Sequence, residues 1–357
     1  MLKYLHENKN DYSIEFFLNE LTQVVKLLGI LETKIGLYHF EDILFPLLYK
    51  KEAQATLNIE GTQTTICDTF EGEIKIQQCA NAGMGEFYNL IHGILFGSDY
   101  LTNNQFSHEF IQSLHRIVMH RRNTEFQHKH VGQYKHQNNF ITNSAGEVVY
   151  QPPEYTTVDQ YMDELIDYMN EEPSGTHPLI KAAVIHAQFE SIHPFENGNG
   201  RVGRLLTSLY MYKAGIICSP FFYISESIHQ DKPMYYQMLS STRSSNYNEW
   251  IRFFLQKCIV QANAQIHYVD SLNGLYERTK TSLQNFINSP QYNSIIECLF
   301  THPVLNSAYL ANVLGVTSGQ ARRYLDVLEK NNILICGDHK RNKTYYFKDF
   351  LDLCMIT

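Results

Sequence analysis

Residues 181–215 read KAAVIHAQFESIHPFENGNGRVGRLLTSLYMYKAG, a stretch in which two helical patterns flank a glycine-containing loop. The first pattern has apolar residues at helical spacing and breaks at Pro194. The second has one apolar face, with residues at i, i+3, i+4, i+7 and i+8: Val202, Leu205, Leu206, Leu209 and Tyr210. Gly215 then supplies a C-terminal stop. The stretch therefore predicts two helices joined by the loop HPFENGNG.

This loop has the features of an anion-binding site. Gly198 and Gly200 precede a helix N-terminus, where backbone N–H groups and the helix dipole favour negative charge. Arg201 and Arg204 are three residues apart in the first turns of that helix, so both can contact successive phosphates. His193 stands at the other side of the loop, and its near-neutral pKa suits removal of a proton from a hydroxyl. The residues predict a phosphate site beside a general base.

Two common nucleotide motifs and one structural alternative compete with this interpretation. GNGRVG fits the dinucleotide pattern GxGxxG, but that motif needs a preceding strand and a βαβ unit, and here a helix precedes it. The P-loop pattern GxxxxGK[ST] does not occur in the sequence. From the residues alone, a glycine turn between two core helices with solvated arginines remains an equal alternative.

Composition favours a helical globular protein. Among 357 residues, 44% are hydrophobic and 18% charged, with only 19 Gly and 10 Pro. A net charge of -8 argues against a chain built to coat nucleic acid. The seven Cys are odd in number and form no CxxC pair, which indicates reduced thiols and a cytoplasmic location. The sequence has neither a signal-peptide core nor an apolar run of about 18 residues, so no membrane span is expected.

The chain is expected to have three parts. Residues 1–84 form an N-terminal helical region, residues 85–265 a larger helical core, and residues 285–357 a separate C-terminal domain. Within the core, residues 132–153 break the helical pattern. Two apolar-containing arms there flank turn residues Asn143, Ser144 and Gly146, and predict a β-hairpin.

The C-terminal domain resembles a winged helix. Helical patterns at 294–300 and 307–314 precede a third helix capped by Thr317 and Ser318, and two short strands follow. Residues 301–357 hold seven Lys and Arg against five Asp and Glu, while the remainder carries a net charge of -10. These basic residues include Arg322, Arg323, Lys340, Arg341 and Lys343. The asymmetry is mild, so a partner-docking module is favoured over DNA binding.

The loop closely resembles the Fic family signature HxFx(D/E)GNGRxxR. The matching residues are His193, Phe195, Gly198, Asn199, Gly200, Arg201 and Arg204. In addition, TLNIEGTQTT at 56–65 resembles the (S/T)xxxE(G/N) inhibitory helix of this family, and the hairpin before Gln151 resembles its flap. The likeness covers residues 35–260 and implies a mainly α, Fic-type helical bundle with a small β-hairpin flap.

The resemblance implies a protein adenylyltransferase that transfers AMP from ATP to a Ser, Thr or Tyr hydroxyl of a target protein. His193 would remove the hydroxyl proton. The amides around Gly198 and Gly200, together with Asn199, would bind phosphates, with Arg201 on the α- and β-phosphates and Arg204 on the γ-phosphate. Tyr235 and Tyr236 could line the nucleotide pocket, because aromatic faces stack on adenine, and packing in the helical core is an equal alternative for one of the two.

Asn197 departs from the signature, which has Asp or Glu at this place to help hold Mg²⁺. An amide oxygen can still ligate the ion, but it brings no negative charge. This substitution is the one feature that favours the alternative function, a catalytically weak regulatory module that binds DNA or protein.

The inhibitory helix is expected at about 47–61, with Thr56, Glu60 and Gly61 as its motif residues. A glutamate in the last turn of a helix opposes the helix dipole, and a cationic partner would offset that cost. The resemblance supplies Arg204 as the partner, which predicts an enzyme held inactive by Glu60. Self-modification and homo-oligomer formation are further expectations from the family.

Overall fold

The computed structural model describes most of the chain. The described residues are 2–3, 5, 12–38, 40–62, 65–66, 69–70, 82–120, 130–142, 145–172, 175–244, 246–287, 289–337 and 343–355. The predicted turn residues Asn143 and Ser144, and the basic residues Lys340 and Arg341, lie outside them.

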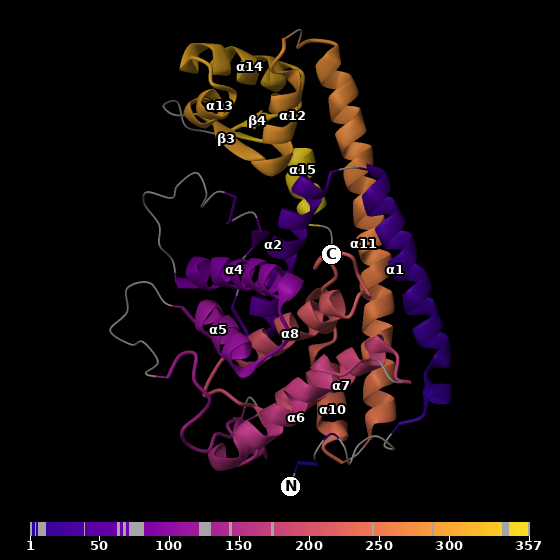
Figure 1. Cartoon of the computed structure of the whole chain (residues 1–357). Helices are drawn as coiled ribbons and strands as arrows, with labels where there is room; N and C mark the ends of the chain where they lie inside the picture. The colour runs from indigo at the N-terminus through magenta and orange to yellow at the C-terminus, as the bar shows by residue number, and fades with distance from the viewer. Residues whose placement is uncertain are drawn as a thin grey trace. The chain divides into compact units, whose positions relative to one another are not determined.

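The described chain is mainly helical, as predicted (Figure 1). The longer helices are α1 (Leu18–Tyr38), α2 (Glu41–Ile59), α4 (Ala82–Asn103), α5 (His108–Val118), α6 (Val158–Asn170), α7 (Pro178–Ile192), α8 (Asn199–Lys213), α10 (Lys232–Thr242), α11 (Tyr247–Gln284), α12 (Tyr292–Thr301), α13 (Ser307–Leu314) and α14 (Ser318–Lys330). The shorter elements are η2 (Ile14–Phe16), η3 (Tyr155–Thr157), α9 (Ser225–His229), α15 (Lys348–Cys354), β1 (Ile141–Thr142), β2 (Val148–Tyr150), β3 (Val304–Asn306), β4 (Ile335–Cys336) and β5 (Thr344–Tyr346). No helix in the described part is long and apolar enough to cross a membrane.

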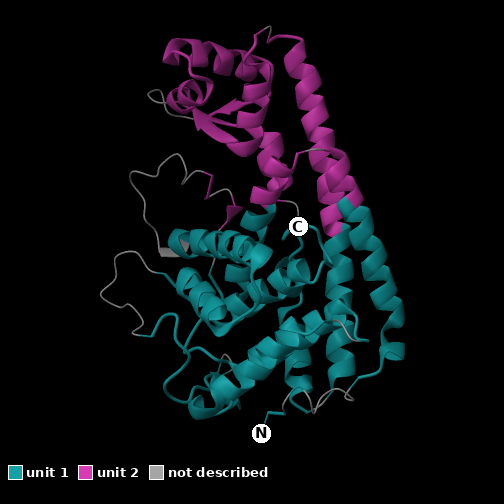
Figure 2. Cartoon of the chain, in the orientation of Figure 1, with its two compact units in different colours: residues 1–32, 48–63, 82–263 teal, residues 33–47, 64–81, 264–357 magenta. Residues whose placement is uncertain are grey.

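The chain forms two compact units (Figure 2). Unit 1 comprises residues 1–32, 48–63 and 82–263, and unit 2 comprises residues 33–47, 64–81 and 264–357. Helices α1, α2 and α11 each contribute residues to both units. The N-terminal helices are thus divided between the units, whereas the predicted boundaries gave them a region of their own.

The core of unit 1 is built around α7. Every residue of α7 from Leu179 to Ile192 is buried, and α8 packs along it and also against α4 and α5. A helix that is apolar nearly all round needs such enclosure. Two of its buried polar groups are paired: the His186 ring bonds Thr207 Oγ1 and the Tyr235 hydroxyl, both at 2.9 Å, and the Ala183 carbonyl accepts from the Trp250 indole N–H at 2.8 Å.

The predicted hairpin is confirmed. Strands β1 and β2 pair antiparallel, with Ile141 opposite Tyr150 and Thr142 opposite Val148. Val148 and Val149 are exposed, so the hairpin presents an apolar surface. Tyr150 fixes its C-terminal end, because the hydroxyl donates to the Ser191 carbonyl at 3.0 Å and the ring stacks under the Arg243 guanidinium at 3.6 Å.

Unit 2 contains the predicted three-helix pattern followed by two strands. The helices are α12, α13 and α14, and the sheet has the order β3-β5-β4, so that it gains a strand that the sequence did not predict. The expected cap is present, because Thr317 Oγ1 accepts a hydrogen bond from the Gln320 N–H at 3.3 Å. The winged-helix interpretation of this unit stays a prediction.

The enclosed imidazole of His186 should make stability depend on pH. Burial, with a smaller contribution from the charge of Arg204, lowers the pKa of His186 to about 3 from its ordinary value of 6.5. As the pH falls below 6.5, the unfolded state binds a proton that the folded state does not, so stability falls with pH. Between pH 7 and pH 5 we expect the wild type to lose about 2 kcal/mol more of its free energy of unfolding than His186→Gln. Urea titrations at both pH values measure this, and equal losses would contradict it.

Candidate active site

The loop between α7 and α8 is shaped by two residues in the left-handed backbone region. His193 ends α7 with φ of 50°, and Gly198 precedes α8 with φ of 77°. A Cβ on Gly198 would lie 2.5 Å from Met119 Sδ, so both the conformation and the space require glycine. The non-glycine residue His193 keeps a strained conformation, which is typical of functional sites.

Phe195 and Asn199 hold the loop in place. Phe195 is fully buried, and its ring stacks on His115 with centroids 3.8 Å apart, so it anchors the loop in the core. The Asn199 side chain accepts from the Phe195 N–H at 2.9 Å and donates to the Phe195 carbonyl at 2.8 Å. Because these bonds use both ends of that amide, the backbone N–H is the part of Asn199 that is available for phosphate.

His115 supports the loop, although it lies outside the signature. The Gly132 N–H donates to His115 Nδ1 at 2.9 Å, so the proton of the neutral ring lies on Nε2, which donates to the Asn197 carbonyl at 3.1 Å. Sequence reasoning missed His115, because it lies 82 residues from Asn197 and no local pattern distinguishes it.

The start of the hairpin segment fixes the same loop. The Lys135 backbone N–H donates to the Pro194 carbonyl at 2.8 Å, and Lys135 Nζ donates to Asn139 Oδ1 at 2.8 Å. Asn139 Nδ2 in turn donates to the Phe195 carbonyl at 3.0 Å. Sequence reasoning also missed Lys135 and Asn139 as supports of the loop.

His193 has the protonation state that a general base needs. Its ring is half-buried, and burial lowers its pKa to about 4, with further lowering by Lys135 and Arg243. Nδ1 lies 3.4 Å from the Glu190 carbonyl, an arrangement that places the proton on Nδ1 and leaves the Nε2 lone pair available. The ring is therefore neutral at physiological pH and can accept a proton.

The N-terminus of α8 presents backbone donors beside a carboxylate. Gly198 caps α8 without a side-chain hydrogen bond, and the first-turn N–H groups of a helix have no partners within the helix. A Cβ on Gly200 would lie 2.7 Å from Glu60 Oε1 and 2.9 Å from Arg204 Nη1. The Glu60 carboxylate thus lies directly over Gly200, where the sequence predicts phosphate binding.

Arg204 is buried and bound by two residues of the predicted inhibitory motif. Its Nη2 donates to Glu60 Oε1 at 2.7 Å and to the Thr56 carbonyl at 3.4 Å, and its Nε donates to Thr56 Oγ1 at 3.3 Å. Burial alone would raise the pKa of Glu60, but the adjacent Arg204 outweighs burial and lowers it below its usual value. Gly61 follows the end of α2 with φ of 92°, the left-handed conformation that glycine commonly takes after a helix C-terminus.

Arg201, the other predicted phosphate-binding arginine, has a longer ion pair than Arg204. Arg201 Nη1 lies 3.3 Å from Glu86 Oε2, and both side chains are largely buried. Arg201 Nε is buried without a hydrogen-bond partner among the described residues. This donor is therefore available to a ligand oxygen at the start of α8.

The two predicted nucleotide-pocket tyrosines differ in exposure. Tyr235 is 1% exposed and its hydroxyl bonds His186, whereas Tyr236 is 47% exposed. A fully buried ring offers no face to a base, so the prediction is corrected for Tyr235, which packs in the core. Tyr236 alone can stack on a nucleotide.

Two buried carboxyl groups near the site were not predicted. Glu52 of α2 is 3% exposed, and burial raises its pKa to about 7. Glu190 of α7 is 7% exposed, and burial likewise raises its pKa to about 7. Glu190 Oε1 has no hydrogen-bond partner among the described residues. It lies so close to Gly203 that a Cβ added to this glycine would be 2.6 Å from it.

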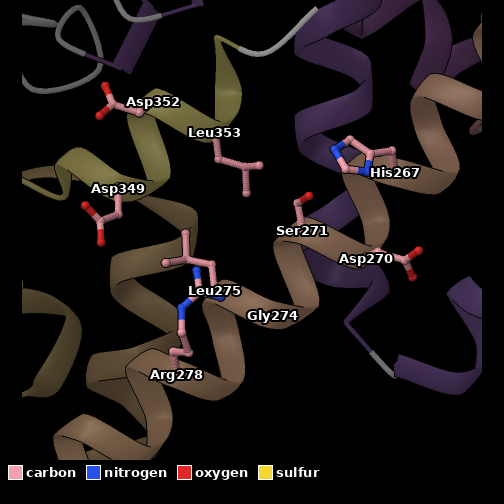
Figure 3. Close-up of a pocket in the computed structure, with 9 residues that line it drawn as sticks. All are labelled: His267, Asp270, Ser271, Gly274, Leu275, Arg278, Asp349, Asp352 and Leu353. Atoms are coloured by element: carbon pink, nitrogen blue, oxygen red, sulfur yellow. The ribbon is translucent and has the colours of Figure 1, made fainter.

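Unit 2 contains a separate cavity of about 640 Å³ (Figure 3). Residues of α11 and α15 line it, including Arg278, Asp349 and Asp352. Asp270 at its edge pairs with Lys34 at 2.6 Å. None of the predicted site residues lines this cavity. In the part of the chain that the structure describes, no group of three or more His, Cys, Asp or Glu could hold a metal ion.

Comparison with known proteins gives a consistent match over the loop and its helices. The family model described as Fic/DOC family matches residues 105–211. A protein adenylyltransferase Fic of Nematostella vectensis is 30% identical over 139 residues, which cover 38% of this chain and 30% of that protein. Protein adenylyltransferase fic-1 of Caenorhabditis elegans is 28% identical over 138 residues, which cover 38% of this chain and 24% of that one. The matches thus span less than a third of the length of these relatives.

Solved structures agree on the fold. A Fic family protein from Desulfovibrio desulfuricans matches with a TM-score of 0.54 and 19% identity, over 91% of this chain and 95% of that one. A Fic domain-containing signaling protein from Bacteroides thetaiotaomicron matches with a TM-score of 0.52 and 18% identity, over 71% of this chain and 97% of that one. Together with the loop that joins a neutral His193 to the donors of α8, these matches identify residues 105–211 as a Fic/DOC family domain within a Fic-type fold.

Proposed function

We propose that the protein transfers AMP from ATP to a hydroxyl group of a target protein and that Glu60 inhibits this reaction. The observation that carries the proposal is the position of the Glu60 carboxylate. It lies over Gly200 and bonds Arg204 at 2.7 Å, so the N-terminus of α8 already accommodates anionic oxygens. The relatives named protein adenylyltransferases support the same chemistry.

In the proposed reaction, His193 Nε2 accepts the proton of the target hydroxyl. The hydroxyl oxygen forms a bond to the α-phosphorus, and the bond from that phosphorus to the bridging oxygen of the β-phosphate breaks. Pyrophosphate leaves, and AMP remains on the target. A neutral base near the attacking oxygen is what general-base catalysis requires, and the lowered pKa of His193 meets this condition.

The N-terminus of α8 would bind and orient the phosphates. The N–H groups near Gly198, Asn199 and Gly200 point to the helix end, where the dipole also favours negative charge. The unpartnered Nε of Arg201 would contact the α- and β-phosphates, and Arg204 the γ-phosphate once Glu60 withdraws. Tyr236 would stack on the base, since its ring is exposed. Such charge placement accounts for most of the catalysis in phosphoryl transfer.

Asn197 fits Mg²⁺ as a neutral ligand. Its side chain is exposed on the loop, and the neighbouring Glu196 is half-buried. When bound there, Mg²⁺ would offset the negative charge of the ATP phosphates. Because Asn197 brings no charge, the nucleotide phosphates rather than the protein would hold the ion.

The proposed inhibition follows from competition for Arg204. The γ-phosphate and the Glu60 carboxylate need the same guanidinium, and the carboxylate also covers Gly200. While Glu60 is in place, ATP phosphates therefore cannot take the geometry that places the α-phosphorus before His193.

The position of the label tests the reaction type. We expect Glu60→Gly protein incubated with ATP to label itself or a target from the α-phosphate and not from the γ-phosphate. His193→Ala on that background should reduce the rate by about 10²–10⁴-fold while ATP still binds. Label from the γ-phosphate would indicate kinase chemistry, and an absence of any label would favour a binding module.

Removal of the inhibitory carboxylate should activate the protein. Glu60→Gly frees Arg204 and uncovers Gly200, so AMP transfer at saturating ATP and Mg²⁺ should rise severalfold or more over wild type. Glu60→Gly combined with Arg204→Ala should lose the gain, because the γ-phosphate then has no guanidinium. Initial rates of labelling measure both, and thermal unfolding checks that each variant is folded. Equal rates for wild type and Glu60→Gly would rule out this mode of inhibition.

A carboxylate at position 197 should strengthen Mg²⁺ binding. Asn197→Asp on the Glu60→Gly background should lower the Mg²⁺ concentration that gives half-maximal transfer, because it adds a negative charge next to the phosphates. Asn197→Ser is the matched control without charge. If the Mg²⁺ requirement is unchanged or higher in Asn197→Asp, this side chain does not face the ion.

A further inference from the structure

Three polar residues of α2 lie on one face of the helix. Glu52, Thr56 and Glu60 are spaced at i, i+4 and i+8, so their side chains follow each other along the axis. Glu60 is at the end of the helix, and its side chain is 35% exposed. Glu52 and Thr56 lie deeper, at 3% and 0% exposure. Glu52 was not among the predicted site residues.

The Glu52 carboxyl group connects α2 to the start of α9. Ser225 Oγ donates to Glu52 Oε1 at 2.5 Å, and Thr56 Oγ1 donates to the same oxygen at 3.0 Å. Ser225 is the first residue of α9 and is 1% exposed. Because both hydroxyls meet Oε1, the contacts form whether or not Oε2 carries a proton. Glu52 Oε1 thus joins a hydroxyl of α2 to a hydroxyl of α9 inside the protein core.

The same contact orients the hydroxyl group of Thr56. A threonine hydroxyl has one proton, and when this goes to Glu52 the lone pairs of Thr56 Oγ1 are left to accept from other donors. Arg204 Nε donates to Thr56 Oγ1 at 3.3 Å. A continuous series of hydrogen bonds therefore runs from Ser225 through Glu52 and Thr56 to Arg204.

We propose that Glu52 and Ser225 form a clamp that positions the inhibitory end of α2 on Arg204. The proposal rests on the function proposed above and adds two positioning residues outside the inhibitory motif. The Glu60 side chain is partly exposed and lies at the end of the helix, so its position depends on how the rest of α2 is held. The clamp lies about 12 Å before Glu60 along the helix, since eight residues rise 1.5 Å each. It holds the helix from which Glu60 projects.

A neighbouring ion pair provides a matched control. Lys51 Nζ lies 3.4 Å from Glu226 Oε1, so it also joins α2 to α9, one residue along from Glu52 and Ser225. This pair lies nearer the surface, with side chains 14% and 18% exposed. If the clamp acts through Thr56, loss of the ion pair should have little effect on Arg204.

The test compares Ser225→Ala, Glu52→Met and Glu226→Gln in the full chain. Ser225→Ala and Glu52→Met should each raise ATP affinity relative to ADP affinity about tenfold in calorimetric titration, because the γ-phosphate gains access to Arg204. Both should also speed amide hydrogen exchange in residues 48–60. Glu226→Gln should match wild type in both measurements. Should Glu52→Met fail to fold, Ser225→Ala, which removes a single hydroxyl, still tests the clamp.

Combining Ser225→Ala with Glu60→Gly distinguishes a loss of Glu60 positioning from a general loosening of the fold. The clamp acts through Glu60, so Ser225→Ala should raise AMP transfer in the wild-type background and add nothing to Glu60→Gly. Unchanged ATP preference and exchange in Ser225→Ala would overturn the clamp, and so would an effect of Glu226→Gln as large as that of Ser225→Ala. A raised ATP preference without any AMP transfer would support the clamp and contradict the proposed reaction, so the two ideas fail separately.

Discussion

A guanidinium group that is almost completely buried needs partners that replace its lost water. The Arg204 side chain is 2% exposed, and among the described residues it donates twice to Thr56 in the last turn of α2 and once to Glu60, directly after that helix. An uncompensated buried charge would cost several kcal/mol. The docking of α2, the covered state of Gly200 and the environment of Glu52 all depend on this requirement. The charge that is expected to bind phosphate is also the charge that organises the resting state.

The loop before α8 shows how rigid support comes from distant parts of the chain. His115 of α5, Lys135 and Asn139 before the hairpin, and Asn199 of α8 together bond the backbone of Asn197, Pro194 and Phe195. A preorganised loop keeps its N–H groups directed at the ligand, so binding requires no free energy to reorganise the loop. This explains why a loop with two left-handed residues can keep a single conformation.

The sequence predicted those parts of the structure that depend on neighbours along the chain. Helices α7 and α8, the loop between them, the hairpin and the stop at Gly61 all carry local signals, and the structure contains each of them. The pairing of Glu60 with Arg204 was expected from the family motif. The supports His115 and Lys135 and the buried Glu52 and Glu190 were missed, because their roles arise from contacts between segments far apart in sequence. Tyr235 was assigned to the pocket because the pattern of a short helix does not tell which of two adjacent aromatic residues faces the core. Strand β3 has three residues and no hairpin partner next to it in sequence, so no turn signal marks it.

The contact between Gly200 and Glu60 has a consequence for how this protein can change in evolution. Any side chain added at Gly200 would meet the Glu60 carboxylate and Arg204 within 3 Å. Under the proposed mechanism it would displace Glu60 and obstruct the phosphates together, so a change at Gly200 would not give an active enzyme. Activating changes would then fall in α2 and the residues that hold it, and inactivating changes in the loop. A lineage could thus change the strength of the proposed inhibition through substitutions in α2 and leave the loop before α8 unchanged.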